Sequence, residues 1–434
     1  MKKNVLNYTV KKQIALLILI ILSGCVQENE MAEKKEQFLS GIFPLATIDD
    51  NKVHLKWETM LNELILRPYE LVVPEKIEIC ISENETSKFQ KLIELDLDNG
   101  GSYSYTADRL QNGKPYFFYT ISKKKGFESV YSDTLMVIPN HKKEFEVLIK
   151  DEKHTFYDVS IAHQKNKIAY VDHYYTWDGG ENCCMTTAIM ISNMDGSGKE
   201  MLTLNSYKPS WSPLNNKIAF HFDGIQGVGW IPAQIVLYDF ETQTTKPLSD
   251  ENEYNFAPAF SENGEFLLFQ SSKNAPDQDT TNMLLLPTTI WFYNLKTFES
   301  FQVTDLSKTL LRSAERPYWI DNDRFLFQGT YPNGQYQIFE SSVSKKQITS
   351  VFKSKWNDYT PSISPDKKKI AFVSDRSGTS QIWVYHIDHK TYSQITGYSL
   401  EESVQPTWNN IQWLDNSTIV FTLSDYSLVK KKVE

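Results

Sequence analysis

The sequence predicts an all-β protein in which a small sandwich is followed by a six-bladed β-propeller. Short runs rich in Val, Ile, Tyr, Phe and Trp alternate with Gly, Pro, Asn and Asp, and aromatic residues make up 13% of the chain. A similar segment recurs throughout the second part of the sequence, as in repeat architectures. The length of 434 residues also exceeds one ordinary domain.

The first residues have the pattern of an export signal. Lysines at positions 2, 3, 11 and 12 precede the uncharged apolar run 14–22, which is shorter than the roughly 20 residues of a membrane-spanning helix. The run ends in Leu22, Ser23, Gly24 and Cys25, a sequence that resembles the lipobox of bacterial lipoproteins. This resemblance implies a signal peptide over 1–24 and lipid on Cys25, whose acyl chains would anchor the protein to a membrane.

Residues 25–40 are polar and charged without apolar periodicity, which predicts a flexible tether. Glu28 and Glu30 resemble the acidic signal that sends some lipoproteins to the outer face of the outer membrane, although a soluble linker explains them equally well. We therefore expect attachment to the cell envelope, most simply the outer membrane, with the periplasmic and surface faces both open.

Residues 41–139 are expected to form the sandwich. Strand-like runs separated by turn residues occur at 53–57, 76–82, 90–97, 102–106, 116–122 and 134–138. Leu110, six residues before Tyr116, and a core Trp at position 57 resemble the signature of fibronectin type III domains, although Thr120 replaces the usual aliphatic residue. The resemblance implies a domain that spaces and presents its neighbour.

Residues 141–434 contain the internal repeat. Each copy reads as an inner strand, a turn rich in Asn, Asp or Gly, and a second strand ending in an aromatic residue, followed by two further strands, as in a propeller blade. The copies cover 159–170, 209–220, 258–269, 317–327, 361–372 and 406–421. A strand at 144–150 is expected to complete the last blade beside the C-terminal strands, because an open edge would expose unpaired backbone groups.

These repeats resemble those of TolB-like propellers, most closely at 361–372 and in the Ser-Asp-Arg-Ser-Gly segment 374–378. The resemblance implies the fold but leaves the function open, because related propellers scaffold, bind and catalyse. Asp366 and Asp375 are expected to hold turns through hydrogen bonds to the backbone rather than to act in catalysis.

Long insertions after the second strand are predicted to build up one face of the propeller. They cover 173–186, 223–232 and 273–289. Their aromatic residues could stack on sugar rings or on a partner's side chains, and their carboxylates could donate oxygen ligands to Ca²⁺, the only cofactor considered. The predicted binding residues are Tyr174, Tyr175, Trp177, Asp178, Glu181 and Trp230. These aromatics could equally cover the domain junction or each other.

A second candidate site lies at the mouth of the central channel. The residue that precedes the first position of each repeat copy should point there: Asp158, Lys208, Ala257, Arg316, Thr360 and Gln405. Converging charges suit an anion site or acid–base chemistry, and they also suit a solvated channel mouth.

Four cysteines occur in the chain, and Cys25 is assigned to lipidation. Cys80 lies in an apolar strand and is expected to be a buried small hydrophobe. The adjacent pair Cys183 and Cys184 could form a strained vicinal disulfide that stiffens the first insertion, or remain two thiols.

Charge and motifs narrow the function classes. The net charge of −9 falls to −13 once the four signal-peptide lysines are removed, which argues against nucleic acid as a partner. No Gly-x-Ser-x-Gly, HExxH or P-loop motif occurs, so the catalytic residues, if any, are unknown, and no metal site is predicted. His154, His173 and His221 fit the histidine-rich metal centre of propeller lyases only weakly.

Three functions therefore remain, and whether the protein is an enzyme is undecided. The favoured one is a non-catalytic binding or scaffolding lipoprotein that holds a glycan or an envelope or surface protein. The others are an enzyme acting on polysaccharide or oligosaccharide through the channel, and a TolB-like member of a cell-envelope complex.

Overall fold

The computed structural model describes residues 36–59, 64–66, 69–86, 88–98, 100–141, 145–151, 154–177, 183–214, 216–223, 233–250, 253–273, 287–397 and 410–433. These ranges are built of strands and contain the short 3-10 turn η3 (Leu306–Lys308) but no α-helix, which confirms the all-β prediction. Within them, no helix has the length and hydropathy needed to cross a membrane. The predicted signal peptide, Leu22, Ser23, Gly24 and Cys25 lie outside the described residues and stay predictions.

The described chain divides into two compact units. Residues 36–46, 54–108 and 114–136 belong to the first, and residues 47–53, 109–113 and those from Val137 onward belong to the second. The sequence placed one boundary near residue 140, whereas the two short segments 47–53 and 109–113 join the second unit.

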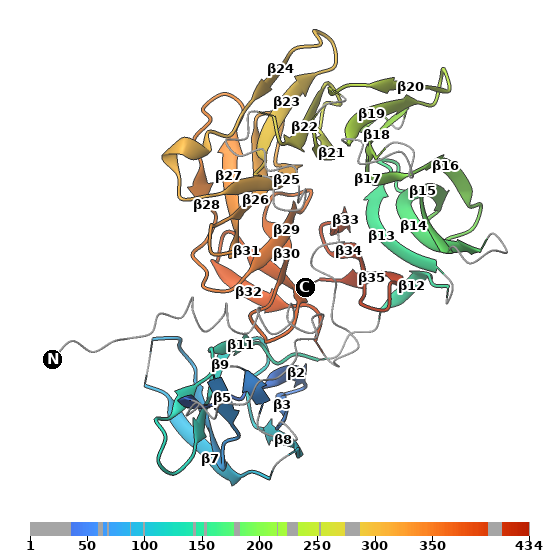
Figure 1. Cartoon of the computed structure of the whole chain (residues 1–434). Helices are drawn as coiled ribbons and strands as arrows, with labels where there is room; N and C mark the ends of the chain where they lie inside the picture. Colours follow the sequence, from blue (N-terminus) through green and yellow to red (C-terminus); the bar gives the residue numbers. More distant parts are fainter. Residues whose placement is uncertain are drawn as a thin grey trace, which may run out of the picture. The chain divides into compact units, whose positions relative to one another are not determined.

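Three sheets precede the repeats (Figure 1). The first contains β1 (Glu36–Leu39), β5 (Tyr69–Val72) and β4 (Leu64–Leu66); the second contains β2 (Leu45–Asp49), β3 (Lys52–Glu58) and β8 (Ser102–Ala107). The third runs β10 (Val130–Tyr131), β9 (Tyr116–Lys123), β6 (Lys76–Ser82) and β7 (Gln90–Asp96), with β11 (Leu135–Val137) also paired to β9. Burial alternates along β3, and Trp57 is 3% exposed, as the period-2 pattern predicts.

The repeats form consecutive four-stranded antiparallel sheets, which follow one another along the colour scale of Figure 1 from green to red. The first sheet contains β13 (His154–Ile161), β14 (Lys167–Trp177), β15 (Cys183–Asn193) and β16 (Glu200–Leu204), and the second contains β17 (Ser206–Trp211), β18 (Lys217–Phe222), β19 (Gln234–Asp239) and β20 (Thr244–Pro247). The third contains β21 (Asn255–Phe260), β22 (Phe266–Ser271), β23 (Thr289–Asn294) and β24 (Ser300–Gln302), and the fourth contains β25 (Ser313–Trp319), β26 (Arg324–Thr330), β27 (Tyr336–Ser342) and β28 (Thr349–Ser350). The fifth contains β29 (Asp358–Ile363), β30 (Lys369–Ser374), β31 (Gln381–His386) and β32 (Thr391–Gln394).

The last sheet joins the two ends of the repeat region. It contains β33 (Gln412–Asp415), β34 (Thr418–Thr422) and β35 (Leu428–Lys432), with β12 (Glu146–Ile149) as its fourth strand. β12 pairs antiparallel with β35, and Val147 lies opposite Val429. The predicted closure of the ring by 144–150 is thereby confirmed. The described residues form six such sheets, while the blade count of the whole chain stays a prediction.

The hydrophobic core lies between neighbouring sheets, which is the packing of a propeller. First strands contact each other in sequence from β13 to β33, and β13 in turn contacts β33. One buried cluster joins Ile218 and Phe220 of β18 to Val171 and Ile189 of the preceding sheet. Another joins Phe421 and Val429 to the sheet that precedes them.

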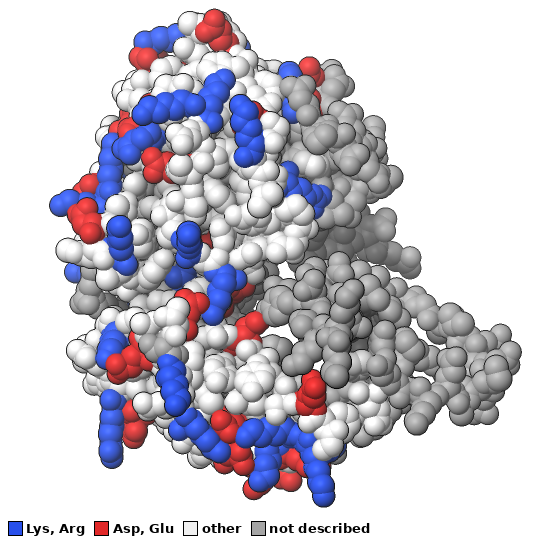
Figure 2. Space-filling view, turned by 90° about the vertical axis from the view of Figure 1, so that its left-hand side faces the viewer, with Lys and Arg blue, Asp and Glu red and all other residues white. Residues whose placement is uncertain are grey.

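The outer surface shows no separation of charge on the face drawn in Figure 2. Lysine and arginine side chains there are interspersed with aspartate and glutamate. Such mixing is typical of a solvated surface.

Candidate functional site at the channel mouth

A bulge interrupts the inner strand of five successive sheets at the same repeat position. The register of each inner strand against the next strand shifts between Tyr157 and Ser160, Tyr207 and Ser210, Phe256 and Ala259, Glu315 and Tyr318, and Tyr359 and Ser362. Proline stands at the second bulge position in four of the sheets, where it suits the break in register because it cannot donate to the ladder, and Val159 stands there in the first sheet.

The predicted channel residues occupy the first position of these bulges. Each has a left-handed backbone, with φ of 54° at Asp158, 52° at Lys208, 49° at Ala257, 53° at Arg316 and 44° at Thr360. This conformation costs a non-glycine residue about 1 kcal/mol or more, so the surrounding sheets must hold it. Gln405 lies outside the described residues.

The bulges border a cavity of about 500 Å³ in the centre of the ring. Lys208, Ala257, Arg316 and Thr360 line one end, each followed by a proline that also lines the wall. Further along, the wall includes Trp211, Tyr318, Trp319 and Trp413, and the turns between the first and second strands of two sheets contribute His163, Lys165 and Glu262. The volume lies within the range of small-molecule binding sites.

Three charged side chains from three sheets meet at this end. The Lys208 ammonium donates to Oδ1 of Asp158, and both residues are buried, with exposed fractions of 8% and 0%. Half-buried Arg316 interacts electrostatically with both. Burial raises the pKa of Asp158, whereas burial and the nearby Arg316 lower the pKa of Lys208 to about 8.

Two buried oxygens beside this cluster have no hydrogen-bond partner among the described residues. They are Oδ2 of Asp158 and Oγ1 of Thr360, whose residue is 4% exposed. Buried polar atoms are rarely left unpaired, because each costs roughly 1–3 kcal/mol. Of the two residues, Thr360 lines the cavity, and an unpaired polar atom at a cavity wall is typical of a binding site.

Second-strand glutamines hold the bulges of the following sheet. Oε1 of Gln270 accepts the backbone N–H of Arg316 at 3.0 Å, and Oε1 of Gln328 accepts that of Thr360 at 3.3 Å. Both carboxylate oxygens of Glu315 are occupied, by Nε2 of Gln328 and by Oγ1 of Thr330, each at 3.0 Å. These side chains therefore fix the backbone that presents Arg316 and Thr360.

Gln270, Gln328 and Glu315 were not among the residues predicted from the sequence. A usable signal existed, because both glutamines directly follow the aromatic residue that ends a repeat copy. His221 occupies the corresponding position one sheet earlier, stacked on Tyr207 with ring centroids 5.1 Å apart.

The histidines considered for a metal centre are placed in separate surroundings. Nδ1 of His154 lies 2.8 Å from Oδ1 of Asp172. His221 packs against Tyr207 and Phe256, and burial lowers its pKa to about 3, so it is neutral. Within the described residues, no group of three or more His, Cys, Asp or Glu could hold a metal ion.

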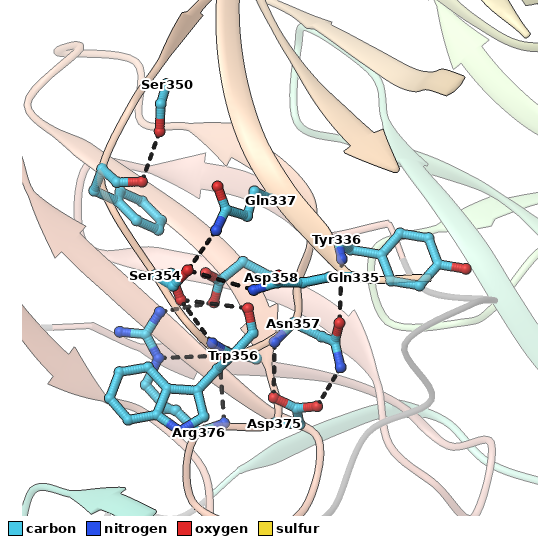
Figure 3. Close-up of polar contacts among 12 residues, drawn as sticks. Gln335, Tyr336, Gln337, Ser350, Ser354, Trp356, Asn357, Asp358, Asp375 and Arg376 are labelled. Atoms are coloured by element: carbon cyan, nitrogen blue, oxygen red, sulfur yellow. Dashed lines mark hydrogen bonds and ion pairs between the residues drawn. The ribbon is translucent and has the colours of Figure 1, made fainter. Parts of the chain in front are cut away.

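The Ser-Asp-Arg segment forms a separate, structural cluster (Figure 3). The Arg376 guanidinium donates to Oδ1 of Asp358 at 2.7 Å and to Oγ of Ser374 at 3.0 Å. Asp375 accepts both the backbone and side-chain N–H groups of Asn357, at 2.9 and 2.7 Å. The segment thus holds the connection that leads into β29, and with it Thr360.

Asp366 has the turn-holding role that the sequence predicts. Its Oδ1 accepts the hydroxyl of Ser364 at 2.6 Å and the backbone N–H of Lys368 at 3.2 Å. Neither Asp366 nor Asp375 is among the residues that line the cavity.

The predicted loop site falls largely outside the described residues. Asp178, Glu181 and Trp230 lie there entirely, so the platform and a calcium site stay predictions. For Tyr174, Tyr175 and Trp177 the structure describes only the backbone, in a long hairpin where Trp177 pairs with Cys183.

The cysteines are placed as follows. Cys80 is a buried free thiol, as predicted, with an exposed fraction of 3%. Cys183 and Cys184 begin strand β15 and pair with Trp177 and Thr176. Their side chains are not described, so the vicinal disulfide stays a prediction.

No known protein family and no curated protein match the sequence. Among solved structures, the chain is similar to TolB from Acinetobacter baumannii, with 18% identity over 75% of this chain and 77% of that one, at a TM-score of 0.41. It is also similar to the β-propeller domain of the trilobed protease from Pyrococcus furiosus, with 14% identity over 66% of this chain and 97% of that one, at a TM-score of 0.41. It is similar as well to an oligogalacturonate lyase in complex with manganese, with 12% identity over 67% of this chain and 96% of that one, at a TM-score of 0.44. The solved structures similar to this chain thus include TolB and other β-propeller proteins.

Proposed function

We propose that the protein is a lipid-anchored, non-catalytic binding protein of the cell envelope, whose propeller holds a glycan or a protein at the channel mouth. The observation that carries this proposal is the cluster of Asp158, Lys208 and Arg316 at the end of a cavity of about 500 Å³. Strained backbone at these residues, maintained by neighbouring sheets, supports a binding role.

The non-catalytic reading follows from how the polar groups at the mouth are engaged. Gln270 and Gln328 hold backbone N–H groups, and both oxygens of Glu315 accept hydrogen bonds. Among the described residues, Glu262 is the one carboxylate that lines the cavity, and it lies 3.1 Å from the Lys367 ammonium, so no second carboxylate stands beside it for paired acid–base work on a glycosidic bond.

An enzyme acting on oligosaccharide is the second candidate, and one observation favours it. The pKa of Lys208 is lowered to about 8, close to the range in which a buried amine exchanges protons. A TolB-like role in an envelope complex is the third candidate, and its support is the repeat motif at 361–378.

In this proposal the sandwich is a fibronectin type III-like spacer and Cys25 is the lipid anchor. The sheet orders β2-β3-β8 and β10-β9-β6-β7 support a sandwich of that kind. The spacer would lift the propeller from the membrane.

The test is a glycan array and an envelope pull-down with the chain from residue 26, in parallel with the R316Q variant. We expect a ligand that the wild type retains and R316Q loses, with K353Q, an exposed lysine outside the cavity wall, as the matched control. Turnover of a captured oligosaccharide would favour the enzyme instead, and identical capture by R316Q would reject the channel mouth as the site.

A further inference from the structure

We infer that the channel mouth recognises a carboxylate group of its ligand, bound between the Lys208 ammonium and the Arg316 guanidinium. This inference rests on the proposed function and names the chemistry that the same site selects.

The charges facing the cavity are predominantly positive. Lys165, Lys208 and Arg316 line it, and Glu262 is the acidic residue among the described lining residues. Glu262 lies 3.1 Å from the ammonium of Lys367, which offsets its charge. A positive cavity in a chain of net charge −9 would draw anions from solution, because its low-dielectric walls focus the field.

The acidic residues of the cluster stand behind the cations. Asp158 is 0% exposed and does not line the cavity, and Glu315 is likewise absent from the wall. Both carboxylate oxygens of Glu315 accept hydrogen bonds from Gln328 and Thr330, which belong to β26. The negative charge of Glu315 is therefore directed toward that strand. An anion in the cavity would meet the two cations first.

Asp158 indicates which anion fits this geometry. One planar carboxylate already binds the Lys208 ammonium within reach of the Arg316 field. Lys208 has three N–H donors and Arg316 has five in a fork that matches a carboxylate. A ligand carboxylate can therefore engage both cations while Lys208 keeps its bond to Asp158.

An unpartnered oxygen at the cavity wall suits a ligand that also carries hydrogen-bond donors. Thr360 lines the same end of the cavity, and its Oγ1 has no hydrogen-bond partner among the described residues. A hydroxyl or amide N–H adjacent to the carboxylate would satisfy it. Hydroxy acids and acylated amino acids both have this arrangement.

Binding should weaken above pH 8. The pKa of Lys208 is lowered to about 8, so its positive charge is lost as the pH rises through that value. Of the groups that act on it, Arg316 lowers the pKa of Lys208 and Asp158 raises it, while His221 is neutral because burial lowers its own pKa to about 3. Tyr157 and Tyr207 stay protonated, because burial raises their pKa values.

Two acidic probes, each with a neutral analogue, test the inference by calorimetry on the full mature chain. Glucuronate is compared with glucose, and N-acetylglycine with N-acetylglycinamide, so the two pairs distinguish a sugar from a peptide source of the carboxylate. At least one acid should bind about tenfold more tightly than its analogue and weaken between pH 7 and 9. Equal binding of acid and analogue in both pairs would overturn the inference.

Variants connect the binding to the two cations. R316Q should lower the affinity for the acid about tenfold, R316K should lower it less, and K353Q should leave it unchanged. K208M alone would leave the buried Asp158 carboxylate without its ammonium partner and could prevent folding. The double variant K208M/D158N removes that unpaired charge, and it should also lose binding of the acid. Full acid binding by R316Q would reject the assignment.

The outcome separates the two proposals. If an envelope ligand depends on Arg316 but neither acid competes with it, the carboxylate inference fails and the binding function stands. If an acid binds as described but no envelope ligand is captured, the inference stands and the proposed function fails.

Discussion

Arg376 is a fully enclosed charge in the propeller, with an exposed fraction of 1%. Its guanidinium lies 4.6 to 6.0 Å from five ring centroids, those of Phe352, Trp356, Phe372, Trp383 and Tyr392. Asp358, 0% exposed, supplies the opposite charge. A pair in such surroundings is costly to break, because the remaining charge has no access to water.

Replacing Arg376 with methionine should therefore destabilise the propeller by about 3–5 kcal/mol, measured as the shift of its urea unfolding transition. R324M is the matched control, because Arg324 pairs with Asp321 at 2.9 Å on the surface, and its loss should cost about 0–1 kcal/mol. The double variant R376M/D358L should recover part of the loss. Similar shifts for R376M and R324M would contradict this account.

At the scale of the strand, the repeated bulge stores backbone strain to present side chains to the cavity. Ala257 has the left-handed φ of 49° without a functional side chain of its own. The strain at this position can therefore be measured separately from any role in binding.

A257G should raise the melting temperature, corresponding to about 0.5–1 kcal/mol, because the steric strain that glycine relieves in this conformation exceeds the additional entropy that it loses on folding. The control is A219G in β18, a fully buried alanine in a regular ladder, where glycine should lower the melting temperature. A decrease in both variants would show that the bulge is not strained.

The pairing of β12 with β35 offers a second element to test. Val429 is fully buried, whereas Val147, opposite to it in the pair, is 54% exposed. V429D should cost more than about 3 kcal/mol and open the ring, and V147D should stay within about 0.5 kcal/mol of the wild type. Hydrogen exchange in β12 and β34 reports the opening, and equal protection in the two variants would argue against closure by this pair.

The repeat pattern predicted the elements better than the contacts between them. The copies located the inner and second strands and the closing strand 144–150, because each follows from local alternation. The enclosure of Arg376 was not predictable, since Phe352 and Trp356 come from a connection that has no counterpart in the repeat. Likewise, the role of Gln328 depends on the N–H of Thr360 in the next sheet, a relation that no single copy contains.

For the whole molecule, the sequence predicts attachment through Cys25. C25A should abolish incorporation of labelled palmitate and release the chain from the membrane fraction or leave its precursor unprocessed. S23A preserves a small residue before the cleavage position and is the control that should still be lipidated. Retention of processed C25A in the membrane fraction would show that the anchor lies elsewhere.

The order of synthesis gives the β12–β35 pair a further consequence. A ribosome makes β12 before the first complete sheet of the ring, yet makes its partner only after all the others. Until then the growing chain is an open arc with two unpaired edges, and closing it carries the entropy of joining distant segments. The closed ring, and with it the buried contacts of β35, is therefore out of reach until β35 itself has been made.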